Sequence, residues 1–135
     1  MKFLLDTNIV SYFLRDASVN LSQRILDSSP DALAISIISA GELRYGLSKL
    51  VPSRRATDLA QRLNAVLSAI SVLPLPADAA QHYGRTRAQL ESAGTPIGNN
   101  DLWIAAHALA QNMTLVTNNV GEFQRVQDLP VENWL

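Results

Sequence analysis

Four acidic residues lie where short apolar runs of the sequence meet helical patterns. Asp6 follows the first apolar run, and Glu42 lies in the first turn of a predicted helix. Asp101 opens a helix that is apolar on nearly every side, and Glu122 follows the last predicted strand. Carboxylates that gather in one place repel one another unless a cation neutralises them. Their hard oxygen atoms, in a chain without cysteine, suit Mg²⁺ or Mn²⁺ better than Zn²⁺.

Short polar residues accompany these acids and could support such a site. The supporting positions are Thr7, Asn8, Thr117, Asn118 and Asn119. Hydroxyl and amide oxygens can bind a hard cation directly or through water, although they add no negative charge. Helix capping is the alternative for the run Asp6-Thr7-Asn8, because all three side chains can accept an N–H of a first helical turn.

Each of the other acids also has a purely structural explanation. Ser39 and Glu42 match the spacing of a capping box, in which the Glu reaches back to the capping residue. Asp101 could be a first-turn acid behind an Asn100 cap, favoured there by the helix dipole. Glu122 could be a solvated surface charge. The case for a site depends on whether the fold brings the four acids together.

No other catalytic arrangement competes with the acids. His82 and His107 stand on different predicted helices without a second ligand at metal-binding spacing, and we interpret them as partly buried helix residues. The sequence contains no nucleophile elbow and no phosphate-binding glycine loop. Water activated by a metal ion is then the natural attacking group, and a phosphate ester is the natural substrate.

Short apolar runs typical of strands alternate along the chain with helical patterns, and this order predicts an α/β fold. The predicted strands are residues 3–5, 32–38, 70–75 and 113–117, and the predicted helices are residues 8–14, 20–28, 39–50, 53–68, 77–93 and 101–111. Strands that are so short and so uniformly apolar are typical of a parallel sheet covered by helices on both faces. Ligands of such sheets bind outside the carboxyl ends of the strands, where the four acids are expected to converge.

Length and charge restrict the possible classes of protein. A chain of 135 residues predicts one domain over residues 1–135. Its net charge of −1 gives no strong overall attraction to polyanions. No segment resembles a signal peptide or a membrane span, so we expect a cytoplasmic protein.

Local basic residues could nevertheless bind the backbone of a nucleic acid. The candidates are Arg44, Lys49, Arg54, Arg55, Arg85 and Arg87. Solvated helix faces are the alternative explanation, because arginine is common on such faces.

Four stretches together resemble the PIN-domain ribonucleases and, among them, the VapC toxins of bacterial toxin–antitoxin pairs. They are LLDTNIVSYFL, ISIISAGELRYGL, IGNNDLWIAAHAL and LVTNNVGEFQRV, in the order found in that family. The resemblance implies a three-layer PIN-like fold with a mostly parallel central sheet, and Mg²⁺- or Mn²⁺-dependent cleavage of RNA. It also implies homodimerisation and inhibition by a VapB-type antitoxin. Asp6, Glu42 and Asp101 match the metal-binding acids of the family, and Thr7 and Asn8 match its supporting polar positions.

One departure from the family pattern concerns the fourth ligand. Many relatives carry an Asp after the Thr of the last strand, where this chain has Asn118 and Asn119. Glu122 is the nearest acid and fills that role in the subgroup with this ending. Whether Glu122 or an Asn supplies the fourth ligand, and whether one ion or two bind, stays open at this point. The alternatives to a toxin are a PIN nuclease in RNA processing, a structure-specific DNA nuclease and a non-catalytic binding module.

Overall fold

A parallel sheet forms the centre of the protein. The structure, a computed structural model, describes residues 2–135. Within that range the sheet has five strands in the order β3-β2-β1-β4-β5, and every neighbouring pair is parallel. The strands are β1 (Phe3–Leu5), β2 (Leu33–Ser36), β3 (Ser71–Leu73), β4 (Thr114–Val116) and β5 (Val131–Glu132).

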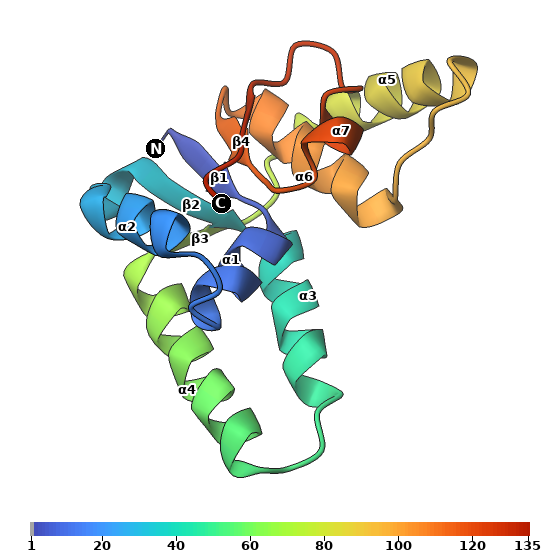
Figure 1. Ribbon diagram of the computed structural model, residues 1–135. Helices are drawn as coiled ribbons and strands as arrows, with labels where there is room; N and C mark the ends of the chain where they lie inside the picture. The colour runs from blue at the N-terminus through green and yellow to red at the C-terminus, as the bar shows by residue number, and fades with distance from the viewer. Residues whose placement is uncertain (1) are drawn as a thin grey trace.

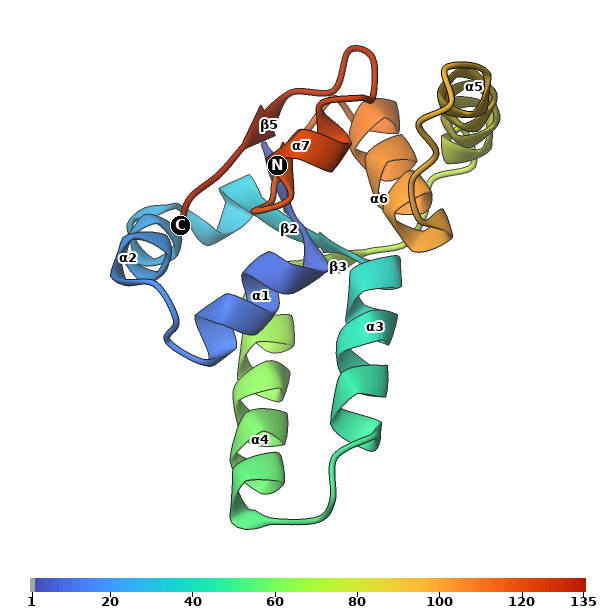
Figure 2. The same cartoon turned by 45° about the vertical axis from the view of Figure 1, so that its right-hand side comes forward.

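Helices cover both faces of this sheet. They are α1 (Thr7–Leu14), α2 (Val19–Asp27), α3 (Ile37–Ser48), α4 (Arg54–Ala69), α5 (Ala79–Ser92), α6 (Asn99–Ala110) and α7 (Val120–Phe123), with a 3₁₀ turn at Pro30–Ala32. Helices α1–α4 lie on one side, and α5–α7 lie on the other (Figures 1 and 2). The predicted three-layer α/β fold with a parallel sheet is confirmed.

Side chains that alternate along each strand supply both hydrophobic cores. Leu5 and Ile35 pack into the core under α1–α4, whereas their neighbours Leu4 and Ala34 pack into the core under α5–α7. Successive residues of a strand point to opposite faces, so a strand buried on both faces must be apolar at every position. This explains why the strands read as uninterrupted apolar runs in the sequence.

Two predicted boundaries are wrong because the capping residues differ from the predicted ones. The strand predicted at residues 32–38 ends at Ser36, whose Oγ accepts a hydrogen bond from the Ile38 N–H at 3.2 Å and caps α3. Ser39 therefore lies inside α3 and forms no capping box with Glu42. Helix α6 likewise begins after Gly98, so Asn100 lies within its first turn and does not cap it.

The sequence patterns also missed the short C-terminal strand β5. It follows α7 and pairs with β4, so β4 is not the last strand of the sheet. Only Val131 and Glu132 belong to it, which is too short for a hydrophobic period to be visible.

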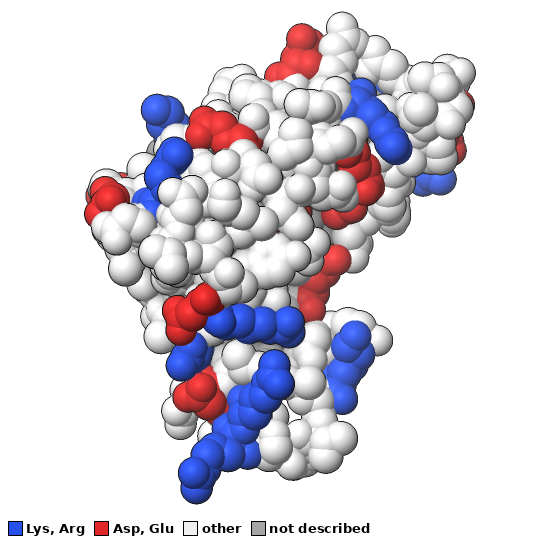
Figure 3. Space-filling view, in the orientation of Figure 1, with Lys and Arg blue, Asp and Glu red and all other residues white. Residues whose placement is uncertain are grey.

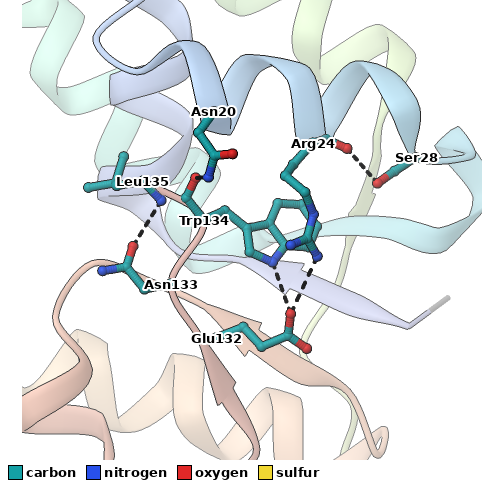
Figure 4. A network of polar contacts seen from close by, with 7 residues as sticks. All are labelled: Asn20, Arg24, Ser28, Glu132, Asn133, Trp134 and Leu135. Atoms are coloured by element: carbon teal, nitrogen blue, oxygen red, sulfur yellow. Dashed lines mark hydrogen bonds and ion pairs between the residues drawn. The ribbon is translucent and has the colours of Figure 1, made fainter.

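A polar network fixes the C-terminal segment against α2 (Figure 4). The buried indole of Trp134 donates to Glu132 Oε1 at 3.0 Å, and the Arg24 guanidinium lies 4.4 Å from the indole centroid. The Asn20 side-chain amide donates to the backbone oxygen of Trp134 at 2.8 Å. These contacts join the last strand to the second helix of the chain.

Helices α3 and α4 form a hairpin that extends away from the sheet (Figures 1 and 2). Their first and last turns, respectively, lie against the body of the protein, and the connecting loop lies at the far end. Arg44 of α3 joins the two helices by donating to the side chain of Asn64 at 2.7 Å. No helix within residues 2–135 combines the length and the apolar character that a membrane crossing requires.

Candidate metal centre

The order in which strands are added to the sheet reverses at β1, and the candidate site lies at this position. The chain proceeds from β1 to β2 and β3 on one side, and later adds β4 on the other side. Parallel sheets bind ligands outside the carboxyl ends of their strands at such a switch point. Asp6 and Thr117 occupy it, each one residue past the end of its strand, and the Asp6 N–H donates to the Val116 carbonyl at 2.9 Å.

Asp6 is both a helix cap and a member of this site. Its Oδ1 accepts from the Thr7 N–H at 2.8 Å and thereby caps α1, while its Oδ2 accepts from the Thr117 hydroxyl at 2.8 Å. The side chain is 3% exposed. Two hydrogen bonds from opposite directions hold the plane of this buried carboxylate in one orientation.

Glu42 reaches the same site from the second turn of α3. Its Oε1 accepts from the Thr7 hydroxyl at 2.6 Å, and its Oε2 accepts from the Asn100 amide at 3.3 Å. Thr7 therefore contacts both acids, through its N–H to Asp6 and its hydroxyl to Glu42. Asn100, which the sequence suggested only as a cap, instead connects α6 to Glu42.

Asp101 and Glu122 complete the group from α6 and α7. The Asp101 carboxyl is close enough to Glu122 to share a hydrogen bond with it when one of the two is protonated. The Asn119 amide donates to Glu122 Oε2 at 2.6 Å and holds that side chain near the end of β4. Glu122 is half-buried, so it is not the freely solvated charge that the sequence allowed.

Glu42 and Glu122 lie near enough to Asp6 and Asp101 to raise the pKa of both. Burial raises the pKa of Asp6, and repulsion from Glu42 and Glu122 raises it further, against the lowering effect of the hydrogen bonds from Thr117 and Thr7. Burial first, and then the neighbouring carboxylates, raise the pKa of Asp101 from 3.8 to about 7. Within residues 2–135, however, no three such side chains come near enough to form a ready-made metal cage.

The chemistry of these side chains fits a hard divalent cation. All four acids offer carboxylate oxygens, which Mg²⁺ and Mn²⁺ prefer. A positive charge placed among them would relieve the repulsion that raises the pKa of Asp101. The residues present therefore suit a metal ion of this class better than they suit an isolated network of carboxylates.

The polar residues after β4 serve the loop in different ways. The Thr117 hydroxyl donates to Asp6 and accepts from the Asn119 N–H at 3.0 Å. Asn118 donates to the Tyr12 hydroxyl at 3.3 Å, and its buried Oδ1 has no hydrogen-bond partner among residues 2–135. Asn8 is exposed and borders a groove beside Glu42.

The candidate basic residues divide into two groups. Arg44 of α3 and Lys49, the C-cap of that helix, lie on the hairpin with Arg54 and Arg55, the first two residues of α4. Lys and Arg atoms gather over this end of the protein, below the acidic atoms near the junction of α3 with the body (Figure 3). Arg85 and Arg87 form the other group, on α5. Arg87 donates to the Tyr83 hydroxyl at 3.0 Å and pairs with Glu91.

Sequence reasoning underestimated His107, which contributes to the support of the site. It is fully buried, and its Nδ1 lies 2.9 Å from the Oγ of Ser36. The contact joins α6, which carries Asp101, to the cap of α3, which carries Glu42. Burial lowers the pKa of His107, which favours the neutral imidazole. Its place on a helix that is apolar all round was the available signal.

Comparisons with known proteins agree with this fold. The model of the PIN domain family matches residues 3–129. Ribonuclease VapC2 of Rickettsia felis is 40% identical over 135 residues, which cover 99% of this chain and 98% of that protein. Ribonuclease VapC1 of Haemophilus influenzae strain R2866 is 38% identical over 138 residues, with the same coverage of 99% and 98%.

A solved structure is similar along the whole chain. It is the crystal structure of VapBC2 from Rickettsia felis bound to a DNA fragment from their promoter, with a TM-score of 0.87 and 37% identity over 100% of both chains. The PIN family model matches nearly all of the sequence, and the two relatives above are more than 30% identical to it. Both comparisons indicate the same family. The chain belongs to the PIN domain family and, within it, to the VapC ribonucleases.

Proposed function

We propose that this protein is a metal-dependent endoribonuclease that acts as the toxin of a toxin–antitoxin pair. One observation carries the proposal: Asp6, Glu42, Asp101 and Glu122 converge outside the carboxyl ends of the central strands, although they are spread from one end of the chain to the other. Membership of the VapC ribonucleases supplies the substrate class, which is RNA.

Asp6, Glu42 and Asp101 would hold Mg²⁺ or Mn²⁺, and Glu122 is the proposed fourth ligand. The bound ion would supply activation of the attacking water and neutralisation of charge on the phosphodiester. The protein contributes the positions of the carboxylates. Thr7 and Thr117 fix Glu42 and Asp6, respectively, so that neither acid has to reorganise when a cation arrives.

The proposed biological partner is a VapB-type antitoxin, in agreement with the similar VapBC2 structure. An arginine of the antitoxin would suit the four acids of the site, because a guanidinium binds carboxylates in a bidentate manner and its positive charge offsets theirs. We propose further that the toxin forms a homodimer and acts in the cytoplasm, where its RNA substrate is found.

The direct test is cleavage of a mixed RNA substrate by the purified protein with Mg²⁺, Mn²⁺ or EDTA. We expect wild-type cleavage with either metal and none with EDTA. Asp6→Asn should abolish cleavage and still give a folded protein. Asp31→Asn is the matched control, because it removes one exposed acid just before β2, at the end of that strand away from the site.

The alternative functions make different predictions in the same assay. Cleavage of single-stranded or duplex DNA in preference to RNA would indicate a DNA nuclease. Metal-independent binding of RNA without cleavage would indicate a non-catalytic module. Full RNA cleavage by a folded Asp6→Asn protein would contradict the proposed mechanism.

A further inference from the structure

A groove leads from the acidic site along the outer face of α3. Its volume is about 610 Å³, which lies in the range of ligand-binding pockets. One end is lined by Thr7, Glu42 and Asn100 of the candidate site, and the other by Tyr45 and Lys49. The groove is therefore continuous with the place where the phosphodiester would be cleaved.

Helical spacing places three chemically different side chains in a row along this groove. Glu42, Tyr45 and Lys49 are separated by three and then four residues, so they lie on one face of α3. With a rise of about 1.5 Å per residue, Tyr45 stands about one turn and Lys49 about two turns beyond the carboxylate. An acid, an aromatic ring and a cation thus follow one another away from the site.

Tyr45 has the exposure and the open surroundings that a stacking surface needs. The residue is 65% exposed and lies in the third turn of α3, on the part of the hairpin that extends away from the body. At Gly41 and Gly46, which also line the groove, no atom of residues 2–135 other than the adjoining helix backbone and chain neighbours lies within 4 Å of where a Cβ would stand. Ile37 and Ile38 complete the lining, and the two glycines leave open space beside the ring, so a flat group can approach it.

Charge determines which kind of ligand suits this surface. The Lys49 ammonium lies 4.8 Å from the Tyr45 ring centroid, and Arg54 and Arg55 stand beyond it at the start of α4. Basic atoms gather at this end of the molecule (Figure 3). Proteins that bind single-stranded nucleic acid combine a cationic track with aromatic rings on which unpaired bases stack.

We propose that Tyr45 stacks on an unpaired nucleobase of the RNA beside the scissile phosphate, and that Lys49 binds the next phosphate outward. This inference rests on the proposed ribonuclease function and assigns a substrate subsite to it. RNA fits the groove better than a protein segment does, because the acidic end would meet the reacting phosphodiester and the basic end would meet its backbone.

The experiment compares Tyr45→Leu with Tyr45→Phe, which keeps an aromatic ring. Kinetics on a short single-stranded RNA with Mg²⁺ should show KM raised roughly five- to hundredfold for Tyr45→Leu, the range expected for loss of one base–aromatic stack. Tyr45→Phe should restore most of the wild-type KM. Val19→Ser, which replaces an exposed apolar residue on α2, is the matched control.

Binding without cleavage gives an independent readout. In an Asp101→Asn background, fluorescence anisotropy should show the same loss of affinity for Tyr45→Leu and the same recovery for Tyr45→Phe. Lys49→Gln should reduce the slope of log K against log salt concentration by about 0.7, the value for one phosphate contact on a single strand. Circular dichroism checks that each variant is folded.

The possible failures can be told apart. If the wild-type protein cleaves no RNA, the proposed function itself is overturned and the subsite with it. If the wild type cleaves RNA but Tyr45→Leu has the wild-type KM and affinity, only the stacking inference is overturned. If Tyr45→Leu changes the oligomeric state or antitoxin binding at unchanged RNA affinity, the groove is a protein interface and the inference is wrong.

Discussion

Neutralising Asp101 should stabilise the metal-free protein even as it removes activity. Partial burial and, after it, the neighbouring acids raise the pKa of this carboxyl from 3.8 to about 7 in the folded protein. The folded state therefore binds the Asp101 proton more tightly than the unfolded state does. Above pH 7 the ionised carboxylate is a net cost to folding, and Asp101→Asn removes that cost.

The expected gain in stability of Asp101→Asn follows from the raised pKa of Asp101. A difference of 3.2 pKa units corresponds to an upper limit of about 4 kcal/mol at 1.36 kcal/mol per unit. Asp101 is only half-buried, so solvent screens part of the repulsion. We therefore expect Asp101→Asn to raise the free energy of unfolding by about 1–2 kcal/mol at pH 8.

The sign of the pH dependence distinguishes this cause from a general packing effect. Below pH 4 the carboxyl is protonated in both states and contributes no difference. As the pH rises from 4 through 7, the unfolded state ionises first, and the wild type loses stability relative to Asp101→Asn. The advantage of the variant should thus be partial at pH 5, roughly two-fifths of its full size for a folded-state pKa of about 7, and full at pH 8.

Urea denaturation in EDTA at pH 5, 6, 7 and 8 measures the difference directly. Addition of Mg²⁺ at pH 8 should stabilise the wild type more than Asp101→Asn, because a cation that binds only the folded state shifts the equilibrium toward it. An Asp101→Asn protein that is less stable than the wild type at pH 8 in EDTA would refute the electrostatic reasoning. A difference that stays constant between pH 5 and pH 8 would refute it equally.

Three further predictions concern the fourth ligand, the antitoxin and the C-terminal segment. Glu122→Gln should weaken metal activation of RNA cleavage more than Asn119→Ala does, because only the glutamate contributes charge. High Mn²⁺ concentration should partly restore cleavage by Glu122→Gln. Metal titrations that superimpose for the wild type and Glu122→Gln would exclude Glu122 as a ligand. Expression of the toxin alone should arrest growth. A structure of its complex with the antitoxin should show a cationic side chain among the carboxylates. An antitoxin bound far from Asp6 would contradict blockade of the metal site. Trp134→Ala should lower the free energy of unfolding by about 3–5 kcal/mol in urea denaturation, and Trp134→Phe by less; a change below about 1 kcal/mol would mean that the C-terminal network contributes little.

The order of strands and helices could be predicted because burial leaves a periodic signal. Strands buried on both faces appear as apolar runs, and helices with one buried face repeat every three to four residues. Elements that depend on a few backbone hydrogen bonds leave no such signal. Strand β5 and helix α7 span only Val131–Glu132 and Val120–Phe123, and the sequence patterns missed both.

Local capping chemistry was harder to predict than the fold. Ser36 and Ser39 are both able to cap a helix, and the Glu three residues after Ser39 favoured the wrong one. Tertiary structure decides between them, because Ser36 ends β2, caps α3 and contacts His107 at 2.9 Å. Contacts between residues 71 positions apart cannot be read from a local pattern. The single domain over residues 1–135 is a prediction from chain length alone.

Asp6 shows why capping and metal binding were not true alternatives. Capping by Oδ1 starts α1 directly after β1, and the Thr117 hydroxyl at Oδ2 attaches the carboxylate to the end of β4. Each carboxylate oxygen has two lone pairs, so a single accepted hydrogen bond leaves the other available to a cation. The same two bonds fix the orientation of the buried group and lower its pKa against the effect of burial, which keeps it closer to the charged form that a metal ion requires. The cap is therefore the means by which the fold presents Asp6 to the site.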